Sequence, residues 1–358
     1  MKKIDFYIIK KFIGTFIFSI ALIICIAIVF DFSEKVDDFL DKDAPWKEIL
    51  FDYYMNFIPY FIYLFAYLFT FISVIFFTSR MAANSEIIAI FSSGMSFRRL
   101  MLPYFISALI IFLGSFLLGS YLIPRSSEVK LAFEEKYYKN PYRYSEENIH
   151  KQIEPEVFIY LNRYFNNSDT GTKFSIEKFV DGKLVSKLMA ASIRWDKEKA
   201  KWVLSNYYIR HIDGINERIE SGLEIDTTLN FFPEEFHRRL NIVETMTTPE
   251  LSRFIEREKA RGADNIKSYL IEKHRRYASP FAVFILTLIG VSLSARKVKG
   301  GIGLQIGLGL LLSFSYIMFM RVTKVFSVSG DLDPFIAVWI PNILYAGIGI
   351  ILYRLAPK

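Results

Sequence analysis

The chain has 358 residues, of which 52% are hydrophobic and 17% aromatic, and its mean hydropathy is +0.26. It is more apolar than an ordinary soluble protein, although 23% charged residues and a formal net charge of +7 also require a water-facing part. The single cysteine, Cys25, excludes an intramolecular disulfide framework, and the four histidines are too dispersed for a metal-ligand motif. We therefore expect no metal or cofactor in this chain.

Six stretches without Asp, Glu, Lys or Arg are long enough to cross a bilayer about 30 Å thick, which takes roughly 20 helical residues. They are Phe12–Phe30, Phe57–Thr78, Leu100–Ile123, Tyr277–Ala295, Gly300–Met320 and Pro334–Tyr353. We interpret the first as an uncleaved membrane helix rather than a signal peptide, because it is longer than the usual apolar region of a signal and no small-residue cleavage site follows it.

The distribution of Lys and Arg around these spans predicts the orientation of the helices. Basic residues lie at both termini and in the second and fourth connections: Lys2, Lys3, Lys10, Lys11, Arg80, Arg98, Arg99, Arg296, Lys297, Lys299, Arg354 and Lys358. The first connection instead reads as an acidic loop with Asp37, Asp38, Asp41 and Asp43. We expect both termini in the cytoplasm and the segment between the third and fourth helices outside it. Because the positive charge is explained by topology, we expect no nucleic-acid partner.

The segment between the third and fourth spans has the pattern of an all-β domain. Short alternating strands are predicted at Val157–Tyr164, Lys173–Val180, Leu184–Trp195, Trp202–Ile212 and Glu217–Asn230. The pairs Asp181-Gly182 and Asp213-Gly214 are typical of hairpin turns, since glycine readily takes the positive φ that such turns need. A sandwich, jelly roll or barrel is expected.

A helical connector is expected after the strands. Thr248-Pro249-Glu250 is typical of a helix start, and this helix should run to about Arg261, before a basic helix from Lys267 to Arg276. The predicted fold is an α-helical membrane protein with six transmembrane helices (3+3) and an inserted all-β, jellyroll-like domain. Its predicted parts are 1–123 (helices 1–3, with a short cytoplasmic helix at about 84–94), 124–247 (the β domain), 248–276 (the connector) and 277–358 (helices 4–6).

Several kinds of chemistry lack support in the sequence. There is no phosphate-binding G-x-x-x-x-G-K-[ST] loop and no H-E-x-x-H zinc-protease motif. The six runs contain no Asp, Glu or His, the groups that ion-coupled transporters use inside their spans. A membrane enzyme acting on lipid or peptide is an alternative, but no short motif supports it. Any transport must draw its energy from another subunit.

The cytoplasmic connection between the second and third spans is the most informative short segment. Asn84 or Ser85 can cap a short helix, Glu86 suits its positive N-terminus, and Gly94 can end it. Ile87, Ile90 and Phe91 would share one face. The pattern fits a helix lying on the lipid surface, and it equally fits a coupling helix that docks into a cytoplasmic motor protein.

Two runs stand out beside the pattern of three helices either side of a β domain: S-E-I-I-A-I-F-S-S-G-M-S (Ser85–Ser96) and the closing L-D-P-F-I-A-V-W-I-P-N (Leu332–Asn342). Together they resemble the LptF/LptG permease family, the transmembrane subunits of the lipopolysaccharide exporter. The resemblance covers essentially the whole chain. The family's function would make this chain a non-enzymatic permease subunit in a bacterial inner membrane, with its β domain in the periplasm.

The resemblance also implies partners. Family members form an LptF–LptG heterodimer, bind a dimer of the LptB ATPase in the cytoplasm, and continue their periplasmic jellyroll into LptC and LptA. ATP and magnesium would be used by that ATPase and not by this chain. Closure of the ATPase dimer would push lipopolysaccharide out of the inner membrane through a cavity lined by the first and fifth helices of each permease subunit. Whether this chain is the F or the G subunit stays open.

Site residues follow from the same resemblance. Glu86 matches the family's acidic residue in the coupling helix. The whole set expected to couple to the ATPase is Ser85, Glu86, Ile87, Ile90, Gly94, Arg98 and Arg99. In the fifth span, Gly303 and Gly307 have the spacing that lets another helix approach closely, either as a moving gate or as an ordinary packing seam within one subunit.

Substrate contacts are predicted from topology. Lipid A phosphates require cations near the outer ends of the helices, and the candidates are Lys35, Arg125, Arg321 and Lys324. Each also fits the role of an interfacial anchor. The segment 31–38 after the first helix is mostly acidic, whereas some relatives carry several basic residues there. The alternative function is an ATPase-coupled mechanotransmission or anchoring subunit that moves no lipid.

Overall fold

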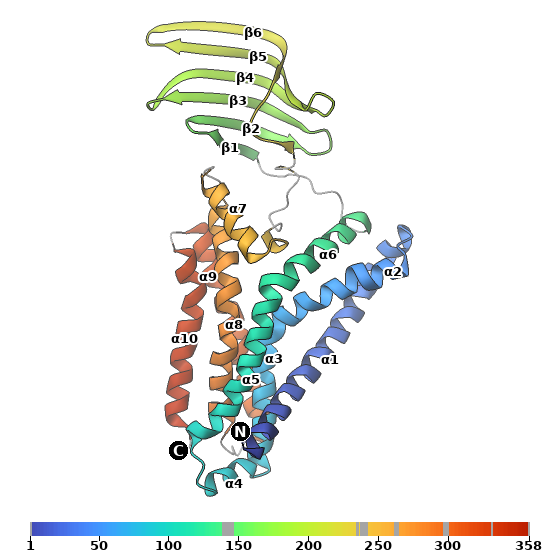
Figure 1. The fold of residues 1–358 in the computed structure, drawn as a ribbon, viewed down its shortest axis with the longest axis vertical. Coiled ribbons are helices and arrows are strands. Elements are labelled where there is room, and N and C mark those ends of the chain that lie inside the picture. Colours follow the sequence, from blue (N-terminus) through green and yellow to red (C-terminus); the bar gives the residue numbers. More distant parts are fainter. Residues whose placement is uncertain are drawn as a thin grey trace. The chain divides into compact units, whose positions relative to one another are not determined.

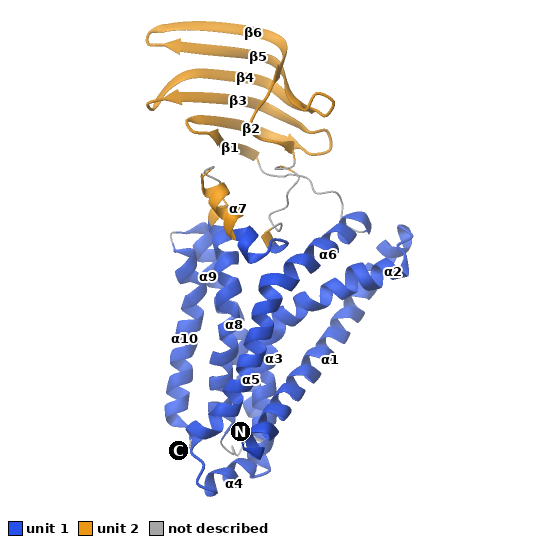
Figure 2. Ribbon diagram, viewed as in Figure 1, with its two compact units in different colours: residues 1–138, 244–251, 267–358 blue, residues 139–243, 252–266 orange. Residues whose placement is uncertain are grey.

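The computed structural model describes residues 2–137, 147–233, 236, 243–260, 265–295, 301–330 and 332–356. These residues form two compact units, coloured separately in Figure 2. Unit 1 is residues 1–138, 244–251 and 267–358, and unit 2 is residues 139–243 and 252–266. Unit 1 is helical and unit 2 contains the β-sheet (Figure 1).

The described residues contain six helices that are long and apolar enough to cross a membrane. The first span is the single helix α1 (Lys3–Asp41). The second is a continuous run of α2 (Trp46–Glu48), η1 (Ile49–Tyr54) and α3 (Met55–Ala83), and the third is a continuous run of α5 (Phe97–Leu117), η2 (Leu118–Leu122) and α6 (Ile123–Tyr137). The others are α8 (Ile266–Ser294), α9 (Gly301–Ser329) and α10 (Pro334–Leu355), while the short α4 (Glu86–Ser92) joins α3 to α5. The predicted 3+3 arrangement of spans is confirmed.

Two of the spans continue further than their apolar runs. α1 has 39 residues, or about 58 Å of helix, against a hydrocarbon core of about 30 Å. Asp37, Asp38 and Asp41, interpreted as part of an acidic loop, lie in the last turns of α1, so that interpretation was wrong for these residues. Residues 124–137, placed by sequence in the β domain, are α6 and belong to unit 1. Both helices thus continue through charged residues beyond the uncharged runs that mark the spans.

Unit 1 has a continuous apolar core at the end of the bundle that carries α4 and both termini (Figure 1). Phe12 of α1, Phe77 of α3 and Tyr104 of α5 pack together there, and the Tyr104 hydroxyl lies 2.9 Å from that of Thr78. A second cluster joins α3, α8, α9 and α10 through Phe71, Leu286, Tyr316 and Tyr345. These contacts hold α3, α5 and α8 together as the centre of the unit.

The β domain is one antiparallel sheet of six strands, which are neighbours in chain order. The strands are β1 (Glu147–Glu154), β2 (Val157–Phe165), β3 (Thr170–Val180), β4 (Lys183–Asp196), β5 (Lys201–Asp213) and β6 (Asn216–Thr227). The predicted all-β domain is confirmed, with β1 as an additional strand that the sequence pattern did not indicate. The β3–β4 turn has positive φ at Asp181 (51°) and Gly182 (74°), as a two-residue hairpin requires.

One face of the sheet carries the apolar core of unit 2. On β5, Trp202 and Leu204 lie in this core on one side of Asn206, and Tyr207 packs against it on the other. The left-handed φ of 51° at Asn206 allows this change in alternation, so that the apolar face continues along the strand. Phe231 covers the face, since the indole Nε1 of Trp202 donates to its carbonyl oxygen at 2.9 Å.

The chain after β6 contains α7 (Thr248–Ala260). This helix begins at the predicted Thr-Pro-Glu motif, and the backbone nitrogen of Thr247 donates to the carboxylate of Glu250 at 2.8 Å. The basic helix predicted from Lys267 to Arg276 is not separate, because α8 runs without a break from Ile266 through Pro280 to Ser294.

Candidate partner-binding and lipid-binding sites

The short helix α4 is bounded by two residues in the left-handed region. Ser85 precedes it with φ 62°, and Gly94 follows it with φ 85°. The backbone nitrogen of Gly94 donates to the carbonyl oxygen of Phe91 at 2.9 Å, which closes the last turn. Glycine takes the left-handed conformation without steric cost, so the backbone can change direction at Gly94 and enter α5.

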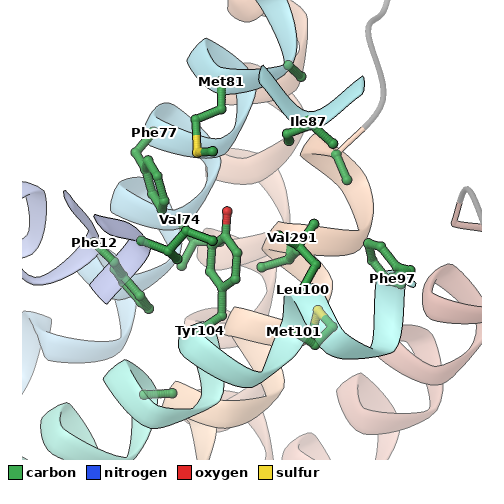
Figure 3. Close-up of a cluster of buried hydrophobic side chains, with 14 of the residues drawn as sticks. Phe12, Val74, Phe77, Met81, Ile87, Phe97, Leu100, Met101, Tyr104 and Val291 are labelled. Atoms are coloured by element: carbon green, nitrogen blue, oxygen red, sulfur yellow. The ribbon is translucent and has the colours of Figure 1, made fainter. Parts of the chain in front are cut away.

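The two faces of α4 have different environments. Ile87 and Ile90 are buried in the core of unit 1, where Ile87 lies near Met81 and Phe97 (Figure 3). The neighbouring Ile88 is 52% exposed, and Ala89 is also exposed. Ile87 and Ile90, predicted to couple to an ATPase, therefore hold α4 on its own chain. The exposed surface of α4 is the Ile88 side.

Two polar contacts join α4 and the start of α5 to the first turns of α1. The hydroxyl of Tyr7 donates to Oε2 of Glu86 at 3.1 Å. Arg99 donates from both terminal nitrogens to the buried carboxylate of Asp5, at 2.8 and 2.6 Å. A movement of α4 would therefore reach α1 directly. Arg98, next in sequence, is exposed and lies outside this pair.

Lys35 is engaged within the chain at the other end of α1. Its ammonium group contacts the carboxylate of Asp31 and the hydroxyl of Tyr53. The hydroxyl of Tyr54 donates to the second carboxylate oxygen of Asp31 at 3.2 Å. Lys35 thus links α1 to η1, and a lipid phosphate would have to compete with Asp31 for it.

Arg125 has a different setting. It borders an apolar hollow of about 460 Å³ that is lined by Gly114, Leu117, Leu118, Tyr121 and Leu122. Both Arg125 and Tyr121 are exposed. A cation beside an apolar surface suits a lipid phosphate with its acyl chains. Of the four predicted substrate residues, Arg125 is therefore the one that borders a described apolar hollow suited to a lipid.

The predicted residues of α9 are exposed, although Arg321 lies near Tyr60 and Lys324 near Glu244. A Cβ atom added at Gly303 or Gly307 would meet no described atom within 4 Å, whereas one at Gly309 would meet Ile75. The Gly303–Gly307 seam is therefore not a packing seam between helices of the described chain. The structure leaves it open to another molecule.

Sequence analysis missed a half-buried group of charges in the first turns of α8, of which Arg276 is fully buried. Arg275 contacts Glu272 at 2.7 Å, and Arg276 contacts Glu272 at 3.3 Å and donates to the carbonyl oxygen of Met246 at 2.7 Å. Burial and the nearby Glu272 raise the pKa of Glu244. The run E-K-H-R-R in this region was the available signal, but it was interpreted only as part of a basic helix from Lys267 to Arg276.

This group surrounds a cavity of about 20 Å³, which is lined by Tyr60, Tyr63, Gly119, Ile123, Glu244, Glu272, Arg275 and Arg276. The Nε atom of Arg275 has no described hydrogen-bond partner, and the space is enough for a single water molecule. Among the described residues, no cluster of three or more His, Cys, Asp or Glu side chains is arranged to hold a metal ion.

These features define a class of protein: a helical membrane protein with six spans, a short helix with one exposed face, apolar hollows on its surface and an inserted β domain. The profile of the lipopolysaccharide export system permease LptF/LptG family matches residues 6–355. Because the match spans essentially the whole chain, the chain belongs to the LptF/LptG family. No curated protein matches the sequence. The family consists of permease subunits of a lipopolysaccharide export system.

Proposed function

We propose that this chain is the permease subunit that extracts lipopolysaccharide from the inner membrane and passes it to periplasmic β-jellyroll carriers. ATP and magnesium are used by a separate cytoplasmic ATPase dimer, and a homologous second subunit completes the transport cavity. Both termini lie in the cytoplasm and the β domain lies in the periplasm. Family membership supports the substrate, and the exposure of α1 and α9 is the structural observation that carries the proposal.

The first and fifth spans are the least buried of the six. In their most apolar windows, 11% of the residues are buried in α1 and 22% in α9, against 67% in α8. Both helices expose rows of large apolar side chains: Ile17, Phe18, Leu22, Val29 and Phe30 on α1, and Leu304, Leu311, Phe314, Met318 and Phe326 on α9. Two such chains, placed face to face, would enclose an apolar space suited to a multi-acyl lipid.

The exposed side of α4 supports docking of the ATPase. Ile88 is apolar and exposed at the end of the helices that the basic residues place in the cytoplasm. Since Tyr7 contacts Glu86 and Asp5 contacts Arg99, closure of an ATPase dimer on α4 would move the start of α1, one of the two cavity helices.

The β domain supports the onward transfer. Its sheet has an apolar face, and β1 and β6 are its edge strands among the described residues. Ile219 and Leu223 of β6 are 66% and 79% exposed. An exposed strand edge is a template for pairing with another sheet, and LptC- and LptA-like jellyrolls are the partners that would extend it.

The first test is purification of the tagged protein from its native membrane in mild detergent, with bound proteins and lipids identified by mass spectrometry. We expect a cytoplasmic ATPase, a second six-helix homologue and a lipid A-bearing glycolipid. An ATPase without glycolipid would favour the mechanotransmission function. Recovery of neither would contradict the exporter function.

A pair of variants tests the docking side of α4. Ile88→Glu and Glu86→Ala should leave the protein in the membrane but lower recovery of the ATPase or its coupling to transport. Val180→Glu is the matched control, because it introduces the same charge at a similarly exposed apolar residue (47%) at the end of β3, away from the proposed docking helix and from the β6 edge. Unchanged ATPase recovery and unchanged transport in both α4 variants would contradict the coupling role.

A further inference from the structure

A second apolar groove lies among α5, α8 and α10, on surfaces that the proposed transport pathway does not use. It has a volume of about 400 Å³, and its lining residues are Arg98, Met101, Leu102, Phe105, Leu288, Ile350 and Tyr353. This volume falls within the range of about 300–1,000 Å³ typical of small-molecule sites. All lining residues belong to unit 1.

The chemistry of the groove changes along the helices. Arg98 is in the first turn of α5 and Tyr353 in the last turn of α10, so the polar groups lie at the helix ends. Phe105 is seven residues further along α5, or about 10 Å deeper. The order from cation and phenol to apolar side chains matches the order from phosphate to acyl chain in a membrane lipid that lies along the helices.

The charge at the mouth of the groove is available to a ligand. Arg99 is held by Asp5, but no carboxylate in the described part of the chain pairs with Arg98, and its side chain is exposed. A guanidinium group matches the oxygens of a phosphate with two parallel N–H donors. The ring of Tyr353 lies 5.5 Å from that of Phe97, so this phenol packs at the same helix end as Arg98.

We propose that this groove binds one glycerophospholipid of the cytoplasmic leaflet, with its phosphate on Arg98 and an acyl chain along Leu102 and Phe105. The helix end that carries α4 and the termini is the cytoplasmic one by its basic residues, so the ligand comes from the leaflet opposite to the one from which lipopolysaccharide is exported.

The bound phospholipid has a structural consequence for α4. Met101 lines the groove and also lies in the buried cluster with Ile87, the residue that holds α4 on the bundle (Figure 3). Filling the groove therefore supports the core beneath α4 from the lipid side. The phospholipid is a resident ligand of the permease and is not transported by it.

The test uses the purified complex in nanodiscs that contain phosphatidylglycerol with a diazirine in its acyl chain. After irradiation, the labelled peptides are identified by mass spectrometry. We expect labels on the groove residues of α5, α8 and α10. Arg98→Gln should lower this labelling about fivefold, since a basic residue near an anionic lipid surface contributes about 1 kcal/mol. Arg354→Gln, an exposed arginine at the same helix end outside the groove, should leave labelling unchanged.

A second variant tests the acyl part while keeping the charge. Leu102 is 48% exposed, so Leu102→Trp should be tolerated in the fold, yet it should fill the groove and remove most of the label from Leu288 and its neighbours. An excess of lipopolysaccharide should not compete with the probe. Equal labelling in Arg98→Gln and wild type, or displacement of the probe by lipopolysaccharide, would each overturn the proposal.

Discussion

α8 and α9 are consecutive in sequence and both have 29 residues, yet they have opposite roles in the fold. α8 is the most buried span and lies at the centre of unit 1, whereas α9 is mostly exposed. α9 is held by a narrow polar and aromatic stripe, in which the hydroxyl of Tyr316 donates to Oδ1 of Asn342 at 2.8 Å. Equal length and apolar character therefore do not decide whether a span is core or interface.

The difference has a physical reason in the residues that meet each helix. Gly290 of α8 lies against α3, where an added Cβ would be 2.8 Å from Cγ1 of Val74 and 3.1 Å from the ring of Phe71. Gly303 and Gly307 of α9 face no described atom within 4 Å. The same small residue thus permits close packing within the chain in α8 and leaves room for another molecule in α9.

The largest effect is expected from Arg275→Met in α8. It removes the Arg275 counter-charge from the half-buried carboxylates of Glu272 and Glu244, which should lower the free energy of unfolding by about 2–3 kcal/mol. Thermal unfolding in detergent measures the change. Arg321→Met, the same substitution at an exposed position of α9, should change stability by less than about 0.5 kcal/mol. Equal effects at the two sites would remove the distinction between the helices.

The next effect is expected from a paired glycine substitution. Gly290→Val should destabilise the fold by about 2 kcal/mol, because its side chain overlaps Val74 and Phe71. Gly307→Val should leave the stability of the isolated chain nearly unchanged. Thermal unfolding of both variants, purified without a partner, provides the comparison. A comparable loss in Gly307→Val would show that α9 is packed within the chain.

Asn342→Leu tests what holds α9 in place. The Asn342 side chain accepts from Tyr316 of α9 and donates to the carbonyl oxygen of Ala278 of α8 at 2.9 Å, so it joins both helices to α10. Removing it should cost about 1–2 kcal/mol, as interhelical hydrogen bonds in membranes do, and should increase proteolysis at the ends of α9 before those of α8. Uniform proteolysis of both helices would contradict this order.

The smallest effect on folding, but a large one on assembly, is expected for Gly303→Val combined with Gly307→Val. The two side chains would project from the open seam of α9 and prevent close approach of a partner helix. The chain should stay folded, and the amount of homologous subunit that co-purifies with it should fall at least tenfold. Gly347→Val on α10, also in open space, is the control and should have no such effect. Normal co-purification of the double variant would move the interface away from this seam.

Local patterns in the sequence determined the architecture of this protein. Runs without charge determined the six spans, because the cost of placing a charge in hydrocarbon depends only on local composition. Alternation and the Asp181-Gly182 turn determined most of the strands, while β1, which is polar along much of its length, gave no such signal. The order of these elements was enough to indicate the family.

Only the tertiary structure decided which face of each element is used. Ile87 and Ile88 are adjacent and chemically identical, but one is buried in the core and the other is exposed. Arg99 pairs with Asp5, 94 residues away, whereas its neighbour Arg98 borders a groove. Lys35 is engaged by Asp31 and Tyr53. Side-chain burial and pairing depend on residues that are distant in sequence, and those neighbours are set only when the helices pack.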